Sequence, residues 1–205
     1  GMEQSALWFQ GSTGALVYKL VSGNFSVSAT VHARKRTDPN ALPASNVQLG
    51  GLMARDPNGT DQGGMENYVF IVLGHDENDI SVETKSTTDS VSDYEGPTWP
   101  SGDAELRLCR VGSTFSLYQR AVGAGSWVLA KSYDRPDLPA ELQVGPNIYT
   151  AFDADLAVRF DEIVFRDAPD PAEVVAGAVH VVERFRQLDG ARAGLAQLEE
   201  GHRVE

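Results

Sequence analysis

Two aromatic side chains in a long polar stretch, Tyr94 and Trp99, are the residues whose chemistry is easiest to interpret. Sites that bind carbohydrate without cleaving it need flat aromatic faces for the sugar rings and a few fixed polar groups in a concave surface. Arg55, Glu83 and Lys85 stand near the ends of predicted strands, where they can border the same hollow. We take these five residues as the candidate ligand-binding site. In the alternative interpretation, Tyr94 and Trp99 only anchor a long loop to the body of the protein.

Metal binding and nucleophilic catalysis receive less support from the residue pattern. The single cysteine, Cys109, excludes an intrachain disulfide and a cysteine-based metal site. Residues 56–61 contain the oxygen-bearing side chains that calcium prefers, but their spacing does not match an EF-hand loop. No serine is marked as an activated nucleophile. No paired metal spacing is found among the four histidines, His32, His75, His180 and His202.

The composition restricts the kinds of partner that we expect. A net charge of −12 repels phosphate groups, which disfavours nonspecific binding to nucleic acid. No apolar run reaches the length of about 18 residues that a membrane-spanning helix needs. We therefore expect no nucleic-acid partner and no membrane span. Gly1-Met2 resembles a cloning remnant and no signal peptide follows it, so we expect a cytoplasmic location, or a secreted one if a signal has been removed.

Residues 105–120 predict a β-hairpin, because two alternating runs flank Gly112-Ser113. A glycine at the first central position suits a two-residue turn of type II′. Folding the chain there places Leu108 opposite Leu117, and residues opposite each other share one side of a sheet. The pattern predicts one apolar face, made by Leu106, Leu108, Phe115 and Leu117, and one polar face, made by Arg107, Cys109, Ser116 and Tyr118.

Other segments also carry strand patterns. Residues 25–34 alternate between apolar and polar side chains, which is typical of a half-buried antiparallel strand. Residues 68–73 are apolar at every position, so we expect both faces of that strand to be covered. Residues 56–67 and 86–102 are predicted to be long surface loops. Further strands are predicted at residues 15–21, 47–55, 80–85, 127–133, 142–149 and 156–166.

Two of these strands give more detailed predictions. Trp127 opens a strand and alternates with Leu129, so we expect it in the core. In the last strand, the apolar residues change parity between Phe160 and Ile163. Keeping all of them inside requires a β-bulge near residues 161–162, because a one-residue slip moves side chains to the opposite face.

The chain changes character after Pro169. Residues 170–173 combine an N-cap aspartate, a proline at the first helical position and an acid three residues after the cap. Apolar residues from Val174 to Leu188 then follow helical spacing. We expect a β domain at residues 1–167 and a helical extension at residues 168–205. The apolar stripe of this helix could cover residues 68–73 or mediate a homo-oligomer.

Several motifs follow one another along the chain: Gly14-Ala-Leu-Val-Tyr-Lys19, Gly23-Asn-Phe25, Gly50-Gly-Leu-Met-Ala-Arg55, Glu105-Leu-Arg-Leu-Cys-Arg110, Trp127 and Phe160-Asp-Glu-Ile-Val-Phe165. Their order resembles that of concanavalin A-like lectin/glucanase domains, in particular their uncharacterised and laminin-G-like branches. The resemblance covers about residues 6–167 and implies an all-β, antiparallel jelly-roll β-sandwich, in which the concave side of a curved sheet often holds sugars. It does not account for the C-terminal α-helical extension that we expect from the residue pattern.

The resemblance also draws attention to one group of acidic residues and to one further aspartate. Glycosidases of this superfamily carry E-x-D-x-x-E on one strand, and Glu77, Asp79 and Glu83 come near that motif. Glu83 lies six residues after Glu77, roughly 20 Å along an extended strand, whereas a retaining mechanism needs carboxyl groups about 5 Å apart. We therefore reject the motif. Asp161 is similar in position to a residue with which some relatives bind a structural calcium, and otherwise we expect no cofactor.

Three hypotheses follow. We favour a non-catalytic, lectin-like module that binds a carbohydrate or related polar ligand on the concave sheet. The second is a hydrolase acting on glycans through an unrecognised carboxylate pair. The third is a structural domain that self-associates through its C-terminal helix. A carboxylate pair in a cleft would favour the enzyme, and an aromatic-floored surface without such a pair would favour binding.

Overall fold

Every strand pairing in the described residues is antiparallel. The computed structural model describes residues 8, 14–59, 65–77, 79–151 and 153–167, with the backbone of Val182–Arg184. The strands are β1 (Ala15–Leu16), β2 (Lys19–Ser22), β3 (Phe25–Arg34), β4 (Gln48–Arg55), β5 (Tyr68–Asp76), β6 (Asp79–Thr88), β7 (Val91–Glu95), β8 (Asp103–Val111), β9 (Thr114–Arg120), β10 (Val128–Asp134), β11 (Glu141–Thr150), β12 (Ala157–Asp167) and β13 (Val182–Arg184).

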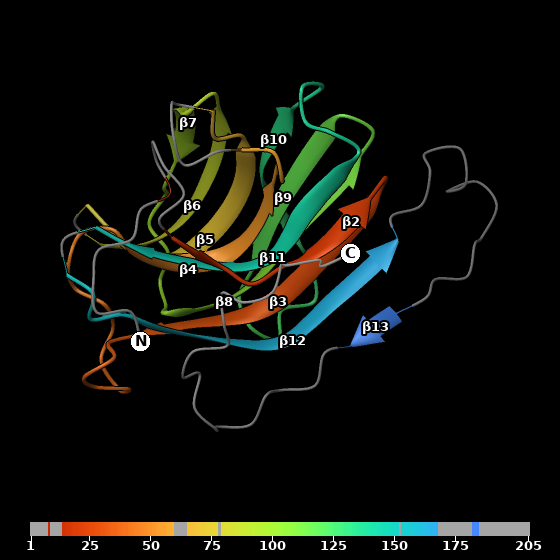
Figure 1. Cartoon of the computed structure of the whole chain (residues 1–205). Helices are drawn as coiled ribbons and strands as arrows, with labels where there is room; N and C mark the ends of the chain where they lie inside the picture. The colour runs from red at the N-terminus through yellow and green to blue at the C-terminus, as the bar shows by residue number, and fades with distance from the viewer. Residues whose placement is uncertain are drawn as a thin grey trace, which may run out of the picture.

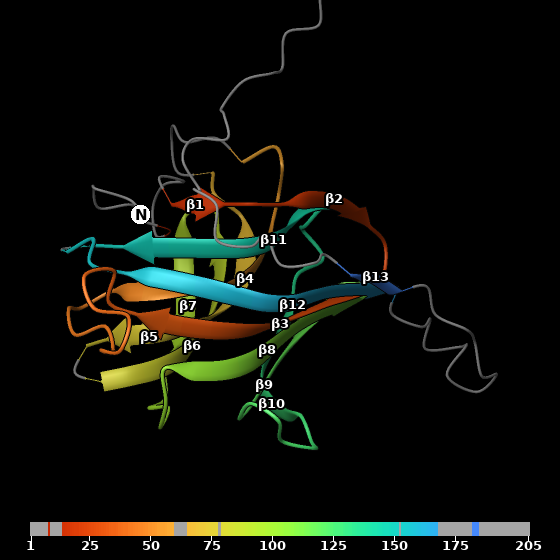
Figure 2. The same cartoon turned by 90° about the horizontal axis from the view of Figure 1, so that it is seen from below.

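The strands form two sheets that stack as a sandwich (Figure 1). The first sheet has the order β1-β11-β4-β5-β6-β7, and β2 also pairs with β11. The second has the order β10-β9-β8-β3-β12-β13. Figure 2 shows β1 and β2 following one another along β11. Strands β4, β5 and β6 bend visibly in Figure 1, so the first sheet is curved. The sequence prediction of an antiparallel sandwich is confirmed.

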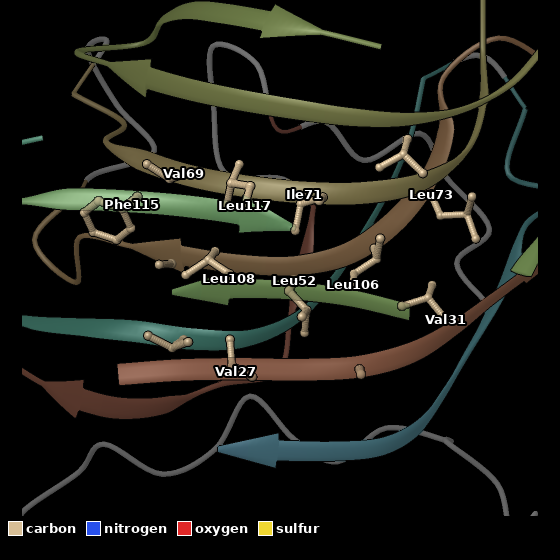
Figure 3. Close-up of a cluster of buried hydrophobic side chains, with 14 of the residues drawn as sticks. Val27, Val31, Leu52, Val69, Ile71, Leu73, Leu106, Leu108, Phe115 and Leu117 are labelled. Carbon is tan, nitrogen blue, oxygen red and sulfur yellow. The ribbon is translucent and has the colours of Figure 1, made fainter. Parts of the chain in front are cut away.

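The core lies between the two sheets (Figure 3). The first sheet contributes alternate residues of β4 and β5, such as Leu52 and Ile71, and the second contributes Val27, Leu108 and Phe115. All five of these side chains are fully buried. Burial of this apolar surface is the main favourable contribution to folding.

The predicted hairpin is confirmed residue by residue. Leu108 pairs with Leu117 across β8 and β9, and Gly112 has a φ of 61°, as a two-residue turn requires. The predicted apolar face, Leu106, Leu108, Phe115 and Leu117, is fully buried. In β3, buried and half-buried residues alternate along the whole strand, as its sequence predicts.

The predicted bulge in the last strand is confirmed. The register between β12 and β3 shifts between Asp161 and Val164, and Glu162 has a φ of 52°. The bulge lets residues of both parities face inward. Phe165 is buried in the core, and the half-buried Phe160 and Ile163 pack against the core.

Two sequence predictions are wrong. Residues 86–102 are not a continuous loop, because β7 forms within them and pairs with β6. Trp127 does not lie in the core: its ring contacts the guanidinium groups of Arg107 and Arg120. Leu129, its expected neighbour in the core, is 52 % exposed. Strand β10 is an edge strand of the second sheet, and the core reaches its later residue Tyr133, whereas Val128 and Leu129 at its start are exposed.

The predicted C-terminal helix lies almost entirely outside the described residues. In the part that is described, Val182–Arg184, the backbone forms β13 and pairs with β12 where a helix was expected. Within the described ranges, no helix is long and apolar enough to cross a membrane.

Candidate functional site

The outer face of the first sheet, turned away from the second sheet, carries polar and aromatic residues in register. Arg55 pairs with Tyr68 across β4 and β5. One row further along, Phe70 pairs with Lys85, and Lys85 pairs with Tyr94 on β7. Glu83 lies two residues before Lys85 on β6 and therefore faces the same way. Four of the five predicted ligand-binding residues, Arg55, Glu83, Lys85 and Tyr94, thus lie on one face.

Lys85 is the centre of a compact group that we call the Lys85 cluster: Lys85, Glu83, Tyr149, Phe70 and Tyr94. The Lys85 Nζ lies 2.9 Å from Glu83 Oε1, and the Tyr149 hydroxyl donates a hydrogen bond of 3.0 Å to the same oxygen. The ammonium group also lies 4.8 Å from the ring centroid of Phe70, 5.1 Å from that of Tyr94 and 5.3 Å from that of Tyr149. Aromatic rings at such distances attract a cation.

Tyr149 reaches this cluster from a distant strand. Tyr149 is on β11, whereas Glu83 is on β6, and strands β4 and β5 lie between them. The Tyr149 ring comes within 5.7 Å of the Phe70 ring on β5, centroid to centroid.

Burial determines the protonation of the cluster. Burial raises the pKa of Glu83, while the charge of Lys85 opposes that rise. Burial, together with the negative charge of Glu83, raises the pKa of Tyr149 well above its ordinary value. Tyr149 therefore keeps its proton and remains the donor to Glu83, and the Glu83 carboxylate depends on Lys85 for its charge compensation.

Arg55 forms a second polar group at the Tyr68 end of the face. Its Nε and Nη2 donate to the two carboxylate oxygens of Glu66, at 2.9 and 3.0 Å, and its Nη1 donates to Gln143 at 2.8 Å. Trp8 is buried here: the Tyr68 hydroxyl donates to the Trp8 carbonyl oxygen, and the Arg55 guanidinium lies 5.8 Å from the Trp8 ring. Trp8 therefore already occupies this end of the face.

Several buried polar atoms on this face have no hydrogen-bond partner within the described part of the chain. Both amide atoms of Asn147 and the Ser81 hydroxyl belong to this group. Asn147 pairs with Gly51 across β11 and β4, in the row that continues to Val72 and Glu83. A buried polar group left unsatisfied costs about 1–3 kcal/mol, so a ligand that pairs with Asn147 would recover that free energy.

Trp99 is not brought together with the other four predicted residues. Its backbone nitrogen donates to Ile80 at 2.7 Å and its indole Nε1 to the Asp103 carbonyl at 3.0 Å. The side chain packs against the core between the sheets. These contacts match the loop-anchoring interpretation, and a role of Trp99 in ligand binding stays a prediction.

Asp161 contacts a histidine and an arginine. Its Oδ2 lies 3.2 Å from His32 Nε2 and 3.2 Å from Arg159 Nη2. Across the ranges described above, no group of three or more His, Cys, Asp or Glu residues could hold a metal ion. The calcium site at Asp161 therefore stays a prediction for which the described residues supply no donor set.

The sequence analysis missed Tyr149, Asn147, Phe70 and Trp8 as members of this face. A usable signal existed for two of them, because Leu142 and Val144 face the core and residues of the other parity on β11 must face outward. Trp8 had no such signal, since it lies outside the predicted strands.

Gly51 also supports a prediction about the construction of the face. A Cβ at this position would lie 2.1 Å from the Ile71 carbonyl oxygen and 2.6 Å from the Val72 Cα, and backbone cannot move aside as a flexible side chain can. We expect Gly51→Ala to lower the free energy of unfolding by about 1–3 kcal/mol. Denaturant unfolding would measure this loss of stability. Gly125→Ala is the control, because a Cβ there meets nothing within 4 Å, and equal losses in both variants would contradict the prediction.

No protein-family model matches the chain, and no curated protein matches it significantly. Solved structures do match. A functionally unknown protein from Saccharomyces cerevisiae aligns with a TM-score of 0.68 and 14% identity, over 82% of this chain and 85% of that one. Lectin I-B4 from Griffonia simplicifolia aligns with a TM-score of 0.50 and 15% identity, over 74% of this chain and 79% of the lectin.

The chain has the concanavalin A-like fold. The chain also aligns with the GH43 BlXynB protein from Bacillus licheniformis, with a TM-score of 0.52 and 11% identity. That match covers 67% of this chain but only 26% of the Bacillus protein. Such low identities establish the fold, and the ligand has to be argued from the site itself.

Proposed function

We propose that this chain is a non-catalytic, lectin-like module that binds a carbohydrate or a related polar ligand on the outer face of the first sheet. The observation that supports this most strongly is the Lys85 cluster, in which a buried ion pair is surrounded by aromatic rings. Sugar-binding sites combine aromatic faces with a few fixed hydrogen-bonding groups in this way.

The chemistry of the face suits a polyhydroxylated ligand. The Asn147 amide offers one donor group and one acceptor that no described residue uses, and sugar hydroxyls can pair with both. Tyr94 is 48 % exposed beside Lys85 and offers a ring for stacking. Trp8 occupies the Tyr68 end of the face, so the proposed ligand lies over the rows further along the strands, which contain Lys85, Tyr94 and Asn147.

Binding to a glycan array tests this proposal. The intact protein should give a reproducible set of hits, and Tyr94→Ala should weaken those hits by about fivefold to tenfold, because stacking on an aromatic ring contributes on the order of 1 kcal/mol. Tyr18→Ala is the matched control, since Tyr18 is 50 % exposed and lies outside the Lys85 cluster. An intact protein without any hit, or hits that both variants retain equally, would refute the proposal.

One observation favours hydrolysis as a second candidate. Burial raises the pKa of Glu83, as is common for a general acid. Both Lys85 and Tyr149 already bind Glu83 Oε1, which makes a structural role the better explanation. Release of reducing sugar from an array hit by the intact protein, lost in Glu83→Gln, would favour the hydrolase.

A further inference from the structure

The outer face of the second sheet, on the opposite side of the sandwich, holds an arginine arrangement that the proposed ligand site does not explain. The guanidinium carbon of Arg107 lies 4.1 Å from the Trp127 ring centroid, and that of Arg120 lies 4.3 Å from the same centroid. A tryptophan ring holds a guanidinium group by cation–π attraction and stacking. Trp127 therefore fixes the position of two cationic groups at once.

Strand register brings a third arginine to this face. Arg166 on β12 pairs with Ser26 on β3, and Ser26 pairs with Cys109 on β8, two residues from Arg107. Arg107 and Arg166 thus flank β3 on a diagonal. Burial lowers the pKa of Arg107, and the positive charges of Arg166 and Arg120 lower it further, so the three groups interact electrostatically.

The charges of these arginines are unevenly compensated. Arg120 donates to Glu105 from Nε at 2.6 Å, and its Nη2 contacts the same carboxylate. Arg107 and Arg166 have no carboxylate partner among the described residues, and Arg107 Nε is buried without an acceptor. Placing two such cations side by side is unfavourable, and it is unexpected in a chain with 29 acidic residues.

Small hydroxyl side chains lie between the two unpaired arginines. Ser28 pairs with Arg107 across β3 and β8, and Ser26 stands beside Arg166. Both serines are half-buried and carry short side chains. Tyr118 pairs with Arg107 from the other side, on β9. Guanidinium forks and hydroxyl donors together match the oxygen atoms of a tetrahedral anion.

We propose that Arg107 and Arg166 bind a small tetrahedral oxyanion, the phosphate or sulfate group of a small molecule, with Ser26 and Ser28 as hydroxyl donors. Trp127 and Arg120 are positioning residues that hold Arg107. The net charge of −12 repels an extended polyanion, which makes a single anionic group the better fit. This proposal is independent of the carbohydrate proposal, because the two sites lie on opposite faces of the sandwich.

Titration with inorganic phosphate and, separately, with inorganic sulfate at constant ionic strength tests the site. Backbone amide shifts of Ser28 and Cys109 and the fluorescence of the intact protein follow the binding. We expect saturable binding at millimolar anion concentration, and the tighter of the two anions identifies the ester class. Chloride at the same ionic strength should produce no saturable change.

Substitutions separate a specific site from general attraction. Arg107→Gln and Arg166→Gln should each weaken binding by about tenfold or more, since each removes a charge-assisted hydrogen bond to the anion. Arg159→Gln is the control: it removes the same charge from an exposed position on β12, and affinity should change less than twofold, or about 0.4 kcal/mol.

Arg107→Lys keeps the charge without the planar fork, and it should lose most of the affinity. The proposal is overturned if neither anion binds saturably, or if Arg159→Gln weakens binding as much as Arg107→Gln. It is also overturned if Arg107→Gln and Arg166→Gln both retain the wild-type affinity for the anion. Circular dichroism establishes whether each variant is folded. If Arg107→Gln does not fold, the affinity of Arg166→Gln for the anion decides the outcome.

Discussion

Replacing Lys85 with methionine is expected to lower the free energy of unfolding by about 3–5 kcal/mol, because Glu83 would lose its charge partner while both positions are buried. Methionine retains much of the volume and the apolar stem, so the loss reports mainly on charge. The double variant Lys85→Met/Glu83→Leu removes the uncompensated carboxylate and should recover most of the stability. Denaturant unfolding of the two variants and the wild type measures this.

The pH dependence of the single variant gives a further check. Burial raises the pKa of Glu83, and without Lys85 the rise becomes larger. A carboxyl group whose pKa is higher in the folded state favours folding below its unfolded pKa and opposes it as the pH rises through the folded pKa. The stability deficit of Lys85→Met should therefore widen as the pH rises above the ordinary pKa of a glutamate carboxyl, about 4.3. A deficit that is constant with pH, or a double variant no more stable than the single one, would show that Glu83 is not an uncompensated charge.

Phe115→Ala is expected to cost about 3–5 kcal/mol, because the side chain is fully buried between the sheets and its removal leaves a cavity. Figure 3 shows the ring among the other core side chains. Val128→Ala is the control: Val128 lies on the edge strand β10 of the same sheet and is 58 % exposed, so its loss should be within about 0.5 kcal/mol. Thermal or denaturant unfolding compares the two. Similar losses in both variants would mean that the core lies elsewhere.

The fold is predictable from the sequence wherever one strand face is apolar and the other polar. The hairpin around Gly112 and the bulge near Glu162 follow from parity, since side chains on a strand alternate between faces. Strand β7 could not be predicted in this way. It is an edge strand whose residues are mostly exposed, so no apolar alternation marks it. Trp127 was misplaced for a related reason, because a tryptophan held by arginines carries the same local pattern as one in a core.

The candidate site is only partly predictable. Arg55, Glu83, Lys85 and Tyr94 could be proposed from residue type and from their places near strand ends. The contact between Tyr149 and Glu83 could not, since it joins β11 and β6 across two intervening strands and depends on the strand order. The burial of Trp8 against Tyr68 likewise depends on where a distant segment packs. Short-range patterns contain neither piece of information.

The central claim is that the ligand binds on the outer face of the first sheet, beside the Lys85 cluster. Amide and side-chain chemical-shift mapping with a glycan identified on the array tests it most directly. We predict shifts that concentrate at Lys85, Tyr94 and Asn147 and saturate together with a single affinity. Shifts confined to the second sheet, or a glycan that binds while these three residues stay unperturbed, would contradict the claim.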